Sequence, residues 1–306
     1  MAQPSKSDIV STLVAATKAG DRRALAKLLT QLERGGPRLV GEDPELLQPQ
    51  STAFRVGITG PPGAGKSTLI SKLIGIWREQ NLNVGVLAVD PSSPFTQGAI
   101  LGDRIRYSDH ALDEHVFIRS LGSRGSLGGL SASAWLMVRA FDVAGFDIVL
   151  LETVGVGQTE LEIMNVADQV SVVLTPESGD GIQGMKAGLM EIADTFAVNK
   201  ADRPGADMFA REIEAALELD PRAMHATGAP KVFKISATEG TGLREFTTHI
   251  DLARAKKSEW VSRRSNEVRL RAEARALLMV EAERSVLARS SQIKTPADLG
   301  QLLRTI

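Results

Sequence analysis

The segment Gly60–Ser67, which reads G-P-P-G-A-G-K-S, has the residue types and spacing of a phosphate-binding loop. It fits the pattern G-x-x-x-x-G-K-[ST], in which backbone N–H groups and a helix N-terminus face an anion. Lys66 can reach the β- and γ-phosphates of a nucleoside triphosphate, and the Ser67 hydroxyl can ligate Mg²⁺. The Lys-Ser pair distinguishes the segment from an ordinary glycine-rich turn. We therefore predict a nucleotide-binding loop made of Gly60, Pro61, Pro62, Gly63, Ala64, Gly65, Lys66, Ser67 and Thr68.

A second motif, Asn199–Asp202 with the sequence N-K-A-D, follows an apolar segment and indicates a guanine base. The Asp202 carboxylate can accept hydrogen bonds from guanine N1–H and the N2 amino group. Adenine offers neither donor there, and leaving the carboxylate unsatisfied is costly. Lys200 can lie along the base, and Ser236–Thr238 resembles the S-A-x loop whose backbone contacts guanine. The predicted base-binding residues are Asn199, Lys200, Asp202, Ser236, Ala237 and Thr238, and the alternative for N-K-x-D is a solvated turn.

Three carboxylates could join the Ser67 hydroxyl in a magnesium site. Asp90 and Glu152 each end an apolar segment that predicts a strand, and Asp103 follows in the segment after Asp90. Magnesium prefers a few carboxylates together with phosphate oxygens and water. The predicted metal ligands are therefore Ser67, Asp90, Asp103 and Glu152. The alternatives are strand-end caps for Asp90 and Glu152 and an exposed helical acid for Asp103.

The alternation of apolar and helical segments predicts the fold that must position these residues. We predict strands at 54–59, 84–89, 116–120, 147–152, 170–175, 195–199 and 231–236, with an amphipathic helix at 68–79. Such alternation is typical of an α/β fold with a mostly parallel central sheet covered by helices on both faces. The predicted class is therefore a P-loop NTPase, with nucleotide across the carboxyl ends of the strands.

Helical regions flank the predicted GTPase domain of residues 51–257. Residues 1–50 carry leucines and alanines at helical spacing, broken near Gly20, which predicts a helical hairpin and then a proline-bearing linker over 42–50. Residues 258–306 predict a helical arm with an apolar stripe made of Val261, Val268, Leu270, Leu277, Leu278, Val280, Val286 and Leu287. Such an arm suits a homodimer, and the alternative is a helix folded back onto its own domain.

The composition limits the classes of partner. The 36 Lys and Arg residues nearly balance 37 Asp and Glu, for a formal net charge of −1, so binding to nucleic acid or to an anionic membrane is not expected. The absence of cysteine excludes disulfides, thiolate catalysis and Cys-ligated zinc. No apolar stretch reaches membrane-spanning length and the first residues show no targeting pattern, so we expect a cytoplasmic protein.

Four segments of the chain resemble the MeaB/ArgK-type GTPases: G-P-P-G-A-G-K-S-T, V-D-P-S-S-P-F-T-x-G-A-I-L-G-D-R, E-T-V-G-V-G-Q and V-N-K-A-D. The resemblance covers about 54–257. It implies a chaperone that gates cofactor delivery to an adenosylcobalamin-dependent acyl-CoA mutase, such as methylmalonyl-CoA mutase, and protects it. An adenosyltransferase is a further candidate partner. The resemblance also implies magnesium ligands at Asp90, Asp103 and Glu152, and a mobile switch loop at 176–186 that contacts the mutase.

Phosphoryl transfer depends mainly on positioning and charge neutralisation. The chain lacks the D-x-x-G-Q element that orients water in Ras-type proteins, and Glu152 and Gln158 are the nearest substitutes. Arg104 or Lys186 could enter as a charge-stabilising finger when a partner binds. A missing finger withholds about 10³–10⁵ in rate, so we expect slow hydrolysis of GTP to GDP and phosphate that the mutase stimulates. The predicted catalytic residues are Lys66, Glu152, Asp103 and Lys186.

Three other functions remain open. A nickel-delivery GTPase needs soft or imidazole ligands, but the chain has no cysteine and few histidines, namely His110, His115, His225 and His249. A P-loop kinase of the ArgK-annotated transport type needs an acceptor pocket or an arginine-rich lid, and only Arg104 and Arg106 suggest one. A scaffold that binds nucleotide without hydrolysis is disfavoured by the intact Lys66 and Ser67.

Overall fold

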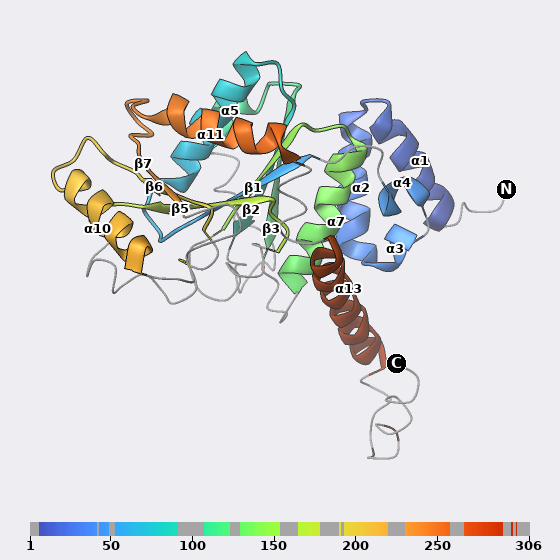
Figure 1. The fold of residues 1–306 in the computed structure, drawn as a ribbon. Coiled ribbons are helices and arrows are strands. Elements are labelled where there is room, and N and C mark those ends of the chain that lie inside the picture. The colour runs from blue at the N-terminus through green and yellow to red at the C-terminus, as the bar shows by residue number, and fades with distance from the viewer. Residues whose placement is uncertain are drawn as a thin grey trace.

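The computed structural model describes residues 6–41, 43–48, 53–90, 107–122, 129–153, 165–177, 190, 193–219, 230–257, 266–289, 295 and 298. Seven strands form one sheet in the order β3-β2-β4-β1-β5-β6-β7, and every neighbouring pair is parallel (Figure 1). The strands are β1 Phe54–Thr59, β2 Val84–Asp90, β3 Val116–Gly122, β4 Ile148–Glu152, β5 Gln169–Leu174, β6 Thr195–Val198 and β7 Lys231–Lys234. The predicted α/β class and its parallel sheet are therefore confirmed.

Strand β1 occupies the central position that the predicted site requires. It pairs with β4 on one side, where Ile58 faces Glu152, and with β5 on the other, where Thr59 faces Val172. After β1 the chain forms β2, β3 and β4 on one side of β1. It then crosses to the other side, where it forms β5, β6 and β7. Ligands of open α/β sheets bind at the carboxyl ends of the strands around such a point. The segment after β1 is therefore at the natural ligand site of this fold.

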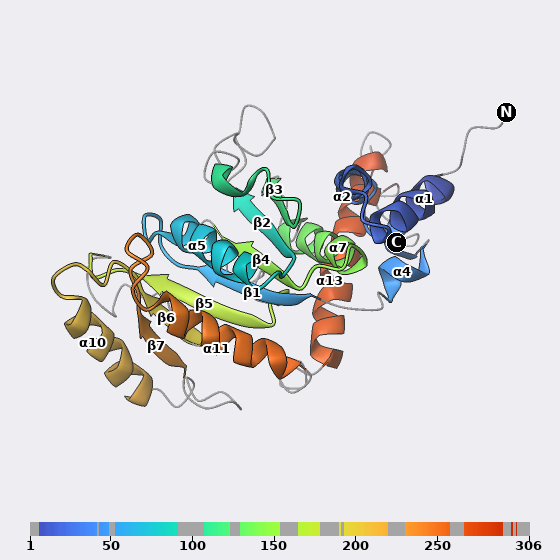
Figure 2. The ribbon, with the colours of Figure 1, turned by 90° about the horizontal axis from the view of Figure 1, so that it is seen from above.

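Helices cover both faces of the sheet (Figures 1 and 2). On one face, α5 (Lys66–Glu79) and α11 (Leu243–Ala255) pack with Val56 and Ile58 of β1 into one apolar core. On the other face, α7 (Gly129–Val143) and α10 (Ala206–Leu219) belong to a second core. Alternate residues of the strands supply the two cores, since successive side chains of a strand point to opposite faces. The layers thus hold β1 and α5 rigidly on either side of the predicted loop.

The predicted N-terminal hairpin is present as α1 (Lys6–Lys18) and α2 (Arg22–Gly35), which pack against each other and, with α3 (Arg38–Gly41), continue the second core beyond α7. The prediction of a linker over 42–50 was wrong at its centre, because Pro44–Leu47 forms the short helix α4. Asp43 caps this helix by accepting a hydrogen bond from Glu45 N at 2.9 Å, and Leu46 is fully buried. Proline at the first helical position starts a helix because its fixed φ suits the first turn.

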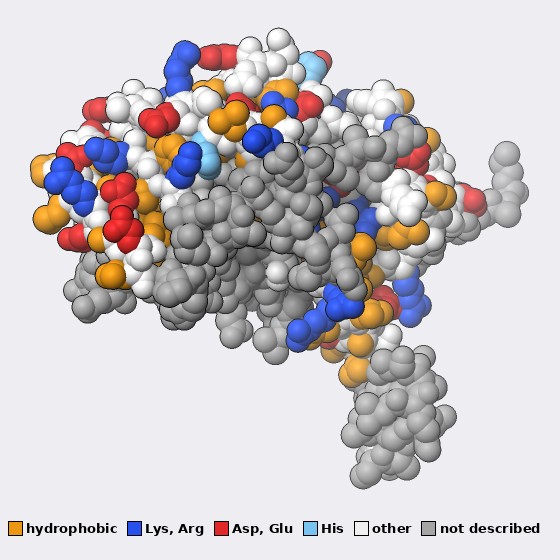
Figure 3. Space-filling view, in the orientation of Figure 1, with side chains coloured by type: hydrophobic (Ala, Val, Ile, Leu, Met, Phe, Trp, Pro, Cys, Tyr) orange, Lys and Arg blue, Asp and Glu red, His pale blue; other side chains and the backbone are white. Residues whose placement is uncertain are grey.

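The C-terminal helix α13 (Asn266–Arg289) lies beside α7 (Figures 1 and 2). Ala276 is buried in the second core, and Leu277 and Val280 are partly buried against it. This inner face corresponds to the alternative of a helix folded back onto its own domain. The predicted stripe is nevertheless divided, because Leu270, Leu278, Val286 and Leu287 are exposed. Figure 3 shows hydrophobic side chains among charged ones on the surface in this region.

Among the described residues, no helix combines the length and the apolar character needed to cross a membrane. The predicted domain boundaries at 50/51 and 257/258 stay predictions. Lys257 links the end of α11 to the start of β1, since its Nζ donates to the carbonyl of Ala53 at 2.8 Å. This contact ties the end of α11 to the chain just before β1. The helices before β1 and the helix α13 share the second core with the strands.

Candidate functional site: the carboxyl ends of the central strands

The loop between β1 and α5 has a backbone that two glycines make possible. Gly60 has φ +143° and Gly65, the residue before α5, has φ +86°. A Cβ atom at position 60 would collide with the carbonyl oxygen of Val173, and one at position 65 would collide with the Asn199 amide. Both conformations are therefore restricted to glycine. The loop follows a buried strand and leads into a helix N-terminus, which is the geometry that places backbone N–H groups around a phosphate.

The Lys66 side chain is buried and lies within the loop that precedes it. Its Nζ donates hydrogen bonds to the carbonyl oxygens of Gly60 at 2.8 Å and Pro61 at 3.1 Å. These neutral acceptors hold the ammonium group inside the curve of the loop. Phosphate oxygens are stronger partners, because hydrogen bonds between charged groups are shorter and roughly twice as strong. Lys66 can therefore serve an anion in this loop with a small movement of its side chain.

Ser67 and Glu152 form the centre of the predicted metal site. Ser67 Oγ donates to Glu152 Oε1 at 2.6 Å, although the two residues are 85 positions apart in sequence. The other carboxylate oxygen, Oε2, accepts a hydrogen bond from the hydroxyl of the fully buried Tyr107. Sequence reasoning missed Tyr107, although it is the only tyrosine of the chain. The two hard oxygen donors match the preference of Mg²⁺.

Asp90 is the last residue of β2, and its side chain is outside the described residues. Strand β2 pairs with β4, with Ala88 facing Glu152, so the backbone of Asp90 continues at the same edge of the sheet. The predicted positions Asp103, Arg104, Gln158 and Lys186 also fall outside the described residues, as does most of the predicted switch loop. Of the predicted metal ligands, the described side chains thus bring together Ser67 and Glu152. In the described part of the chain, His, Cys, Asp and Glu form no group of three that could hold a metal ion.

Asn199 connects the phosphate side of the site to the base side. Its Nδ2 donates to the carbonyl of Ala64 at 2.8 Å, and its Oδ1 accepts from the backbone N–H of Ala237 at 3.0 Å. The side chain is only 2% exposed. Asn199 was predicted as a nucleotide-binding residue, and that role stays a prediction. It joins the phosphate-binding loop to the S-A-T loop that follows β7.

The other predicted base residues surround the same two loops. Lys200 has φ +59°, an uncommon conformation for a residue with a side chain. Asp202 is exposed, and a hydrogen bond from the Ser236 hydroxyl holds the pKa of its carboxyl below the usual range. Ser236 is buried and also contacts the Thr238 hydroxyl at 3.2 Å, whereas Thr238 is exposed. An ionised carboxylate is therefore presented to solvent beside the two predicted base-binding loops, which is compatible with the predicted hydrogen bonds to guanine.

Glu177 also lies beside the predicted base-binding residues, and the sequence analysis placed it in the predicted switch loop of 176–186 without giving it a role of its own. It follows β5 and lies opposite the loop that follows β6. Its Oε2 is 3.2 Å from Lys200 Nζ, and its Oε1 accepts a hydrogen bond from Arg203. Its place just after a predicted strand could have identified it, because β5 and β6 are parallel neighbours in which Leu174 pairs with Val198. Residues that follow paired ends of parallel strands emerge at the same edge of the sheet.

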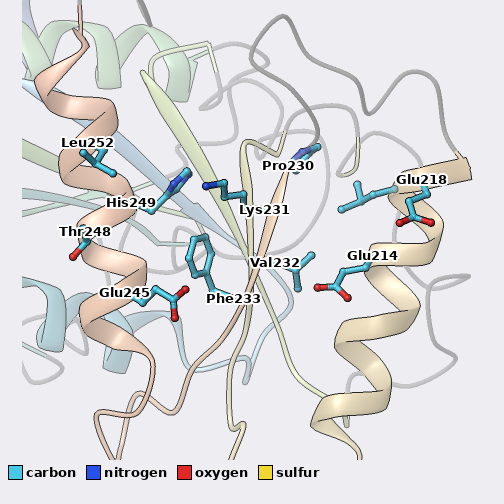
Figure 4. A pocket seen from close by; sticks show the side chains of 11 residues that line it. Glu214, Glu218, Pro230, Lys231, Val232, Phe233, Glu245, Thr248, His249 and Leu252 are labelled. Atoms are coloured by element: carbon cyan, nitrogen blue, oxygen red, sulfur yellow. The ribbon is translucent and has the colours of Figure 1, made fainter.

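Two sizeable hollows of the described surface lie away from this loop. One, of about 630 Å³, lies over the edge strand β7, with Glu214 and Glu245 directed toward the strand from α10 and α11 (Figure 4). The other, of about 750 Å³, lies between α5 and α11. Neither is lined by the residues of the phosphate-binding loop. Polyphosphate is recognised by backbone N–H groups at an exposed loop, so cavity volume does not locate this site.

Comparisons with known proteins show which proteins this chain resembles. A family model described as methylmalonyl Co-A mutase-associated GTPase MeaB matches residues 25–293. A Pyrococcus horikoshii protein provisionally named as a GTPase is 48% identical over 238 residues, which are 78% of this chain and 75% of that protein. The mouse protein named methylmalonic aciduria type A homolog, mitochondrial, is 40% identical over 205 residues, 65% of this chain and 48% of that one.

Among solved structures, the crystal structure of a protein named LAO/AO transport system kinase superposes with a TM-score of 0.68. The two chains are 26% identical, and the alignment covers 99% of each. This likeness extends over the sheet and over the helices before and after it. The family model covers far more than half of the chain and includes the whole sheet. The chain belongs to the MeaB family of methylmalonyl-CoA mutase-associated GTPases.

Proposed function

We propose that this protein is a Mg²⁺-dependent GTP hydrolase that acts as a chaperone of an adenosylcobalamin-dependent acyl-CoA mutase. The observation that carries the nucleotide part is the buried Asn199 side chain, which bonds Ala64 on the phosphate side and Ala237 on the base side. One nucleotide lying across both loops would use the G-x-x-x-x-G-K-S, N-K-x-D and S-A-x motifs together. The mutase part rests on family membership, since the description of the family names the association with methylmalonyl-CoA mutase.

The phosphate-binding residues have separate tasks in this proposal. The backbone N–H groups of Gly63, Ala64 and Gly65 would surround the phosphates, since Pro61 and Pro62 carry none, and the residues at the start of α5 direct the helix N-terminus toward them. Lys66 exchanges the carbonyl oxygens of Gly60 and Pro61 for oxygens of the β- and γ-phosphates. Phosphoryl transfer requires this neutralisation because negative charge is distributed over the transferred group.

The described residues fit magnesium because they offer oxygen donors at the right place. Ser67 gives its single hydroxyl proton to Glu152, so the lone pairs of its oxygen remain available to a metal. Glu152 is itself held by Tyr107, which fixes the direction of the carboxylate. When bound, Mg²⁺ would neutralise charge between the β- and γ-phosphates. Asp90 and Asp103 are proposed as further ligands.

The base-side residues support GTP in preference to ATP. Asp202 is kept ionised by the hydrogen bond from Ser236 and can accept two hydrogen bonds from guanine. We expect Asp202→Asn to weaken GTP binding by about 10–100-fold, because a hydrogen bond to a charged group is lost. The same variant should gain affinity for xanthosine triphosphate, which carries an oxygen in place of the amino group. Equal affinity of the unaltered chain for GTP and ATP would contradict the proposal.

We expect the protein alone to hydrolyse GTP slowly and the mutase to accelerate the hydrolysis. Glu152, Asp103 and Lys186 are the proposed contributors to catalysis beside Lys66. Single-turnover hydrolysis of GTP, measured with and without methylmalonyl-CoA mutase, tests the stimulation. An equal rate in both would remove it. With γ-labelled GTP, a GTPase releases all of the label as phosphate, whereas retention of label on an acceptor would favour the kinase function.

The exposed side of α13 supports the proposal of a homodimer. Leu278 is 68% exposed and Leu287 is 65% exposed, so this face has apolar side chains that a second copy could cover. The double variant Leu278→Glu with Leu287→Glu should shift the mass measured by light scattering to that of a monomer. These side chains do not belong to the buried inner face of α13, so the folded monomer should persist. A dimer of unchanged mass would exclude this face as the interface.

A further inference from the structure

Glu177 is placed to control the Lys200 side chain. The backbone of Lys200 is already fixed, because its carbonyl accepts from Arg203 N at 2.9 Å and the next residue, Ala201, donates to the carbonyl of Ile235 at 2.9 Å. The long side chain of Lys200 is the part that remains to be oriented. Its Nζ lies 3.2 Å from Glu177 Oε2. The carboxylate comes from a different strand end, so it fixes the lysine from outside its own loop.

Arg203 holds Glu177 in place. The guanidinium of Arg203 binds Oε1 while Lys200 binds Oε2, so both oxygens of the carboxylate are engaged. Hydrogen bonds from Arg203 first, and from Lys200 second, keep the pKa of the Glu177 carboxyl below its ordinary range. The group is therefore ionised at neutral pH. A carboxylate bound by two cations can rotate less than one bound by a single lysine.

We infer that Glu177 is a positioning residue for the guanine base, which acts by holding the Lys200 side chain along the base plane and so slows nucleotide release. This inference rests on the proposed function, in which Lys200 lies along guanine. It assigns a role in base retention to a residue outside the N-K-x-D and S-A-x motifs. Glu177 itself does not need to touch the nucleotide.

The expected effect is modest because the three side chains are partly exposed. Lys200 is 29%, Arg203 48% and Glu177 49% exposed, and ion pairs at such positions contribute little. We expect Glu177→Ala to accelerate GDP dissociation about 2–5-fold, with Glu177→Gln between this variant and the unaltered chain. The difference should shrink at high salt, since exposed ion pairs are screened.

Asp207→Asn is the matched control. Asp207 pairs with Lys234, both are exposed, and the pair lies outside the residues assigned to the base. The experiment compares the dissociation rate of GDP from the full-length chains, measured by stopped flow with a chase of unlabelled nucleotide. Inorganic tripolyphosphate is the second probe, because it occupies the phosphate-binding loop and has no base. Melting temperatures verify that the variants are folded.

The inference predicts faster GDP release from Glu177→Ala, an unchanged rate for Asp207→Asn and unchanged tripolyphosphate affinity in all chains. Equal GDP dissociation from Glu177→Ala and the unaltered chain would overturn it. A matching loss of tripolyphosphate affinity would also overturn it, since the effect would then not concern the base. If the unaltered chain bound no guanine nucleotide, the proposed function would fail together with this inference. GDP binding with no effect at position 177 would remove the inference alone.

Discussion

Polar side chains gather at both ends of the parallel sheet, but they differ in burial and in their hydrogen-bond partners. At the carboxyl ends, Ser67, Glu152 and Asp202 lie around a glycine-shaped loop, and Asp202 is exposed. At the amino ends, Arg55 of β1 bonds Asp142 of α7 at 2.6 Å, and both are buried. The first set has oxygen atoms that a ligand can still use. The side chains of the second set bond to one another inside the protein.

The network at the amino ends attaches α13 to the body. Arg269 of α13 pairs with Asp168, which precedes β5, and the Asp168 carboxylate also accepts from Arg55 N at 2.8 Å. The guanidinium groups of Arg55 and Arg269 lie 5.7 and 5.8 Å from the ring centroid of Trp135. Burial by itself lowers the pKa of Arg55, but Asp142 and Asp168 raise it above its ordinary value. The arginine therefore stays charged and needs its partners.

In this fold the residues that attach α13 lie at the amino ends of the strands, whereas the predicted ligand-binding residues lie at the carboxyl ends. A buried ion pair is costly to break, since removal of one partner leaves an unpaired charge. Polar groups at a ligand site must instead exchange partners with little cost. Variants at the two ends should accordingly affect different measurements, and three predictions test this separation.

The largest effect is expected at the amino ends, from Asp168→Ala. This change leaves Arg269 without its carboxylate in a position where that side chain is 12% exposed, and we expect a loss of about 3–5 kcal/mol in the free energy of unfolding. Denaturant unfolding measures the loss. Glu281→Gln is the control for an ion pair that involves α13 near the surface, because Glu281 of α13 pairs with Arg38, which is 72% exposed. It should cost at most about 1 kcal/mol. An equal loss in the free energy of unfolding for both variants would contradict the view that the buried ion pairs at the amino ends attach α13.

The next effect concerns the carboxyl ends, where Lys66→Ala should reduce single-turnover GTP hydrolysis by about 10²–10³-fold. The reason is the loss of a cation that stabilises charge on the transferred phosphoryl group. The free energy of unfolding should change by about 2 kcal/mol or less, since Lys66 Nζ donates to the neutral carbonyl oxygens of Gly60 and Pro61 in its own loop and each such hydrogen bond contributes about 1 kcal/mol. Strong destabilisation by this variant would show that the two ends are not separate.

The smallest effect is expected from Tyr107→Phe, which removes one hydrogen bond to Glu152 without emptying the core. The Mg²⁺ concentration for half-maximal hydrolysis should rise about 10-fold, because residues that orient metal ligands contribute about 10–100-fold to affinity. The readout is a magnesium titration at saturating GTP. Phe141→Leu, a core change on α7, serves as a control for general loosening. An unchanged magnesium requirement would assign Tyr107 to packing alone.

Much of the fold was predictable because its signals are local. Apolar runs gave the seven strands near their observed bounds, and G-x-x-x-x-G-K-S located the turn between β1 and α5. The short helix α4 was missed because its proline was interpreted as a breaker rather than as a first helical residue. Tyr107 was missed, and Glu177 was assigned only to the predicted switch loop, because the sequence around a tyrosine or a glutamate does not indicate which distant side chain it contacts.

By itself, the sequence determined the chemistry of the motifs: a polyphosphate loop, a carboxylate suited to guanine and an oxygen-rich set suited to magnesium. Only the tertiary structure decided which distant groups meet, such as Tyr107 with Glu152, 45 residues apart, and Asp168 with Arg269, 101 residues apart. The physical reason is that a motif depends on the conformation of a few consecutive residues. The meeting of distant side chains depends instead on the strand order of the sheet and on how its helices pack.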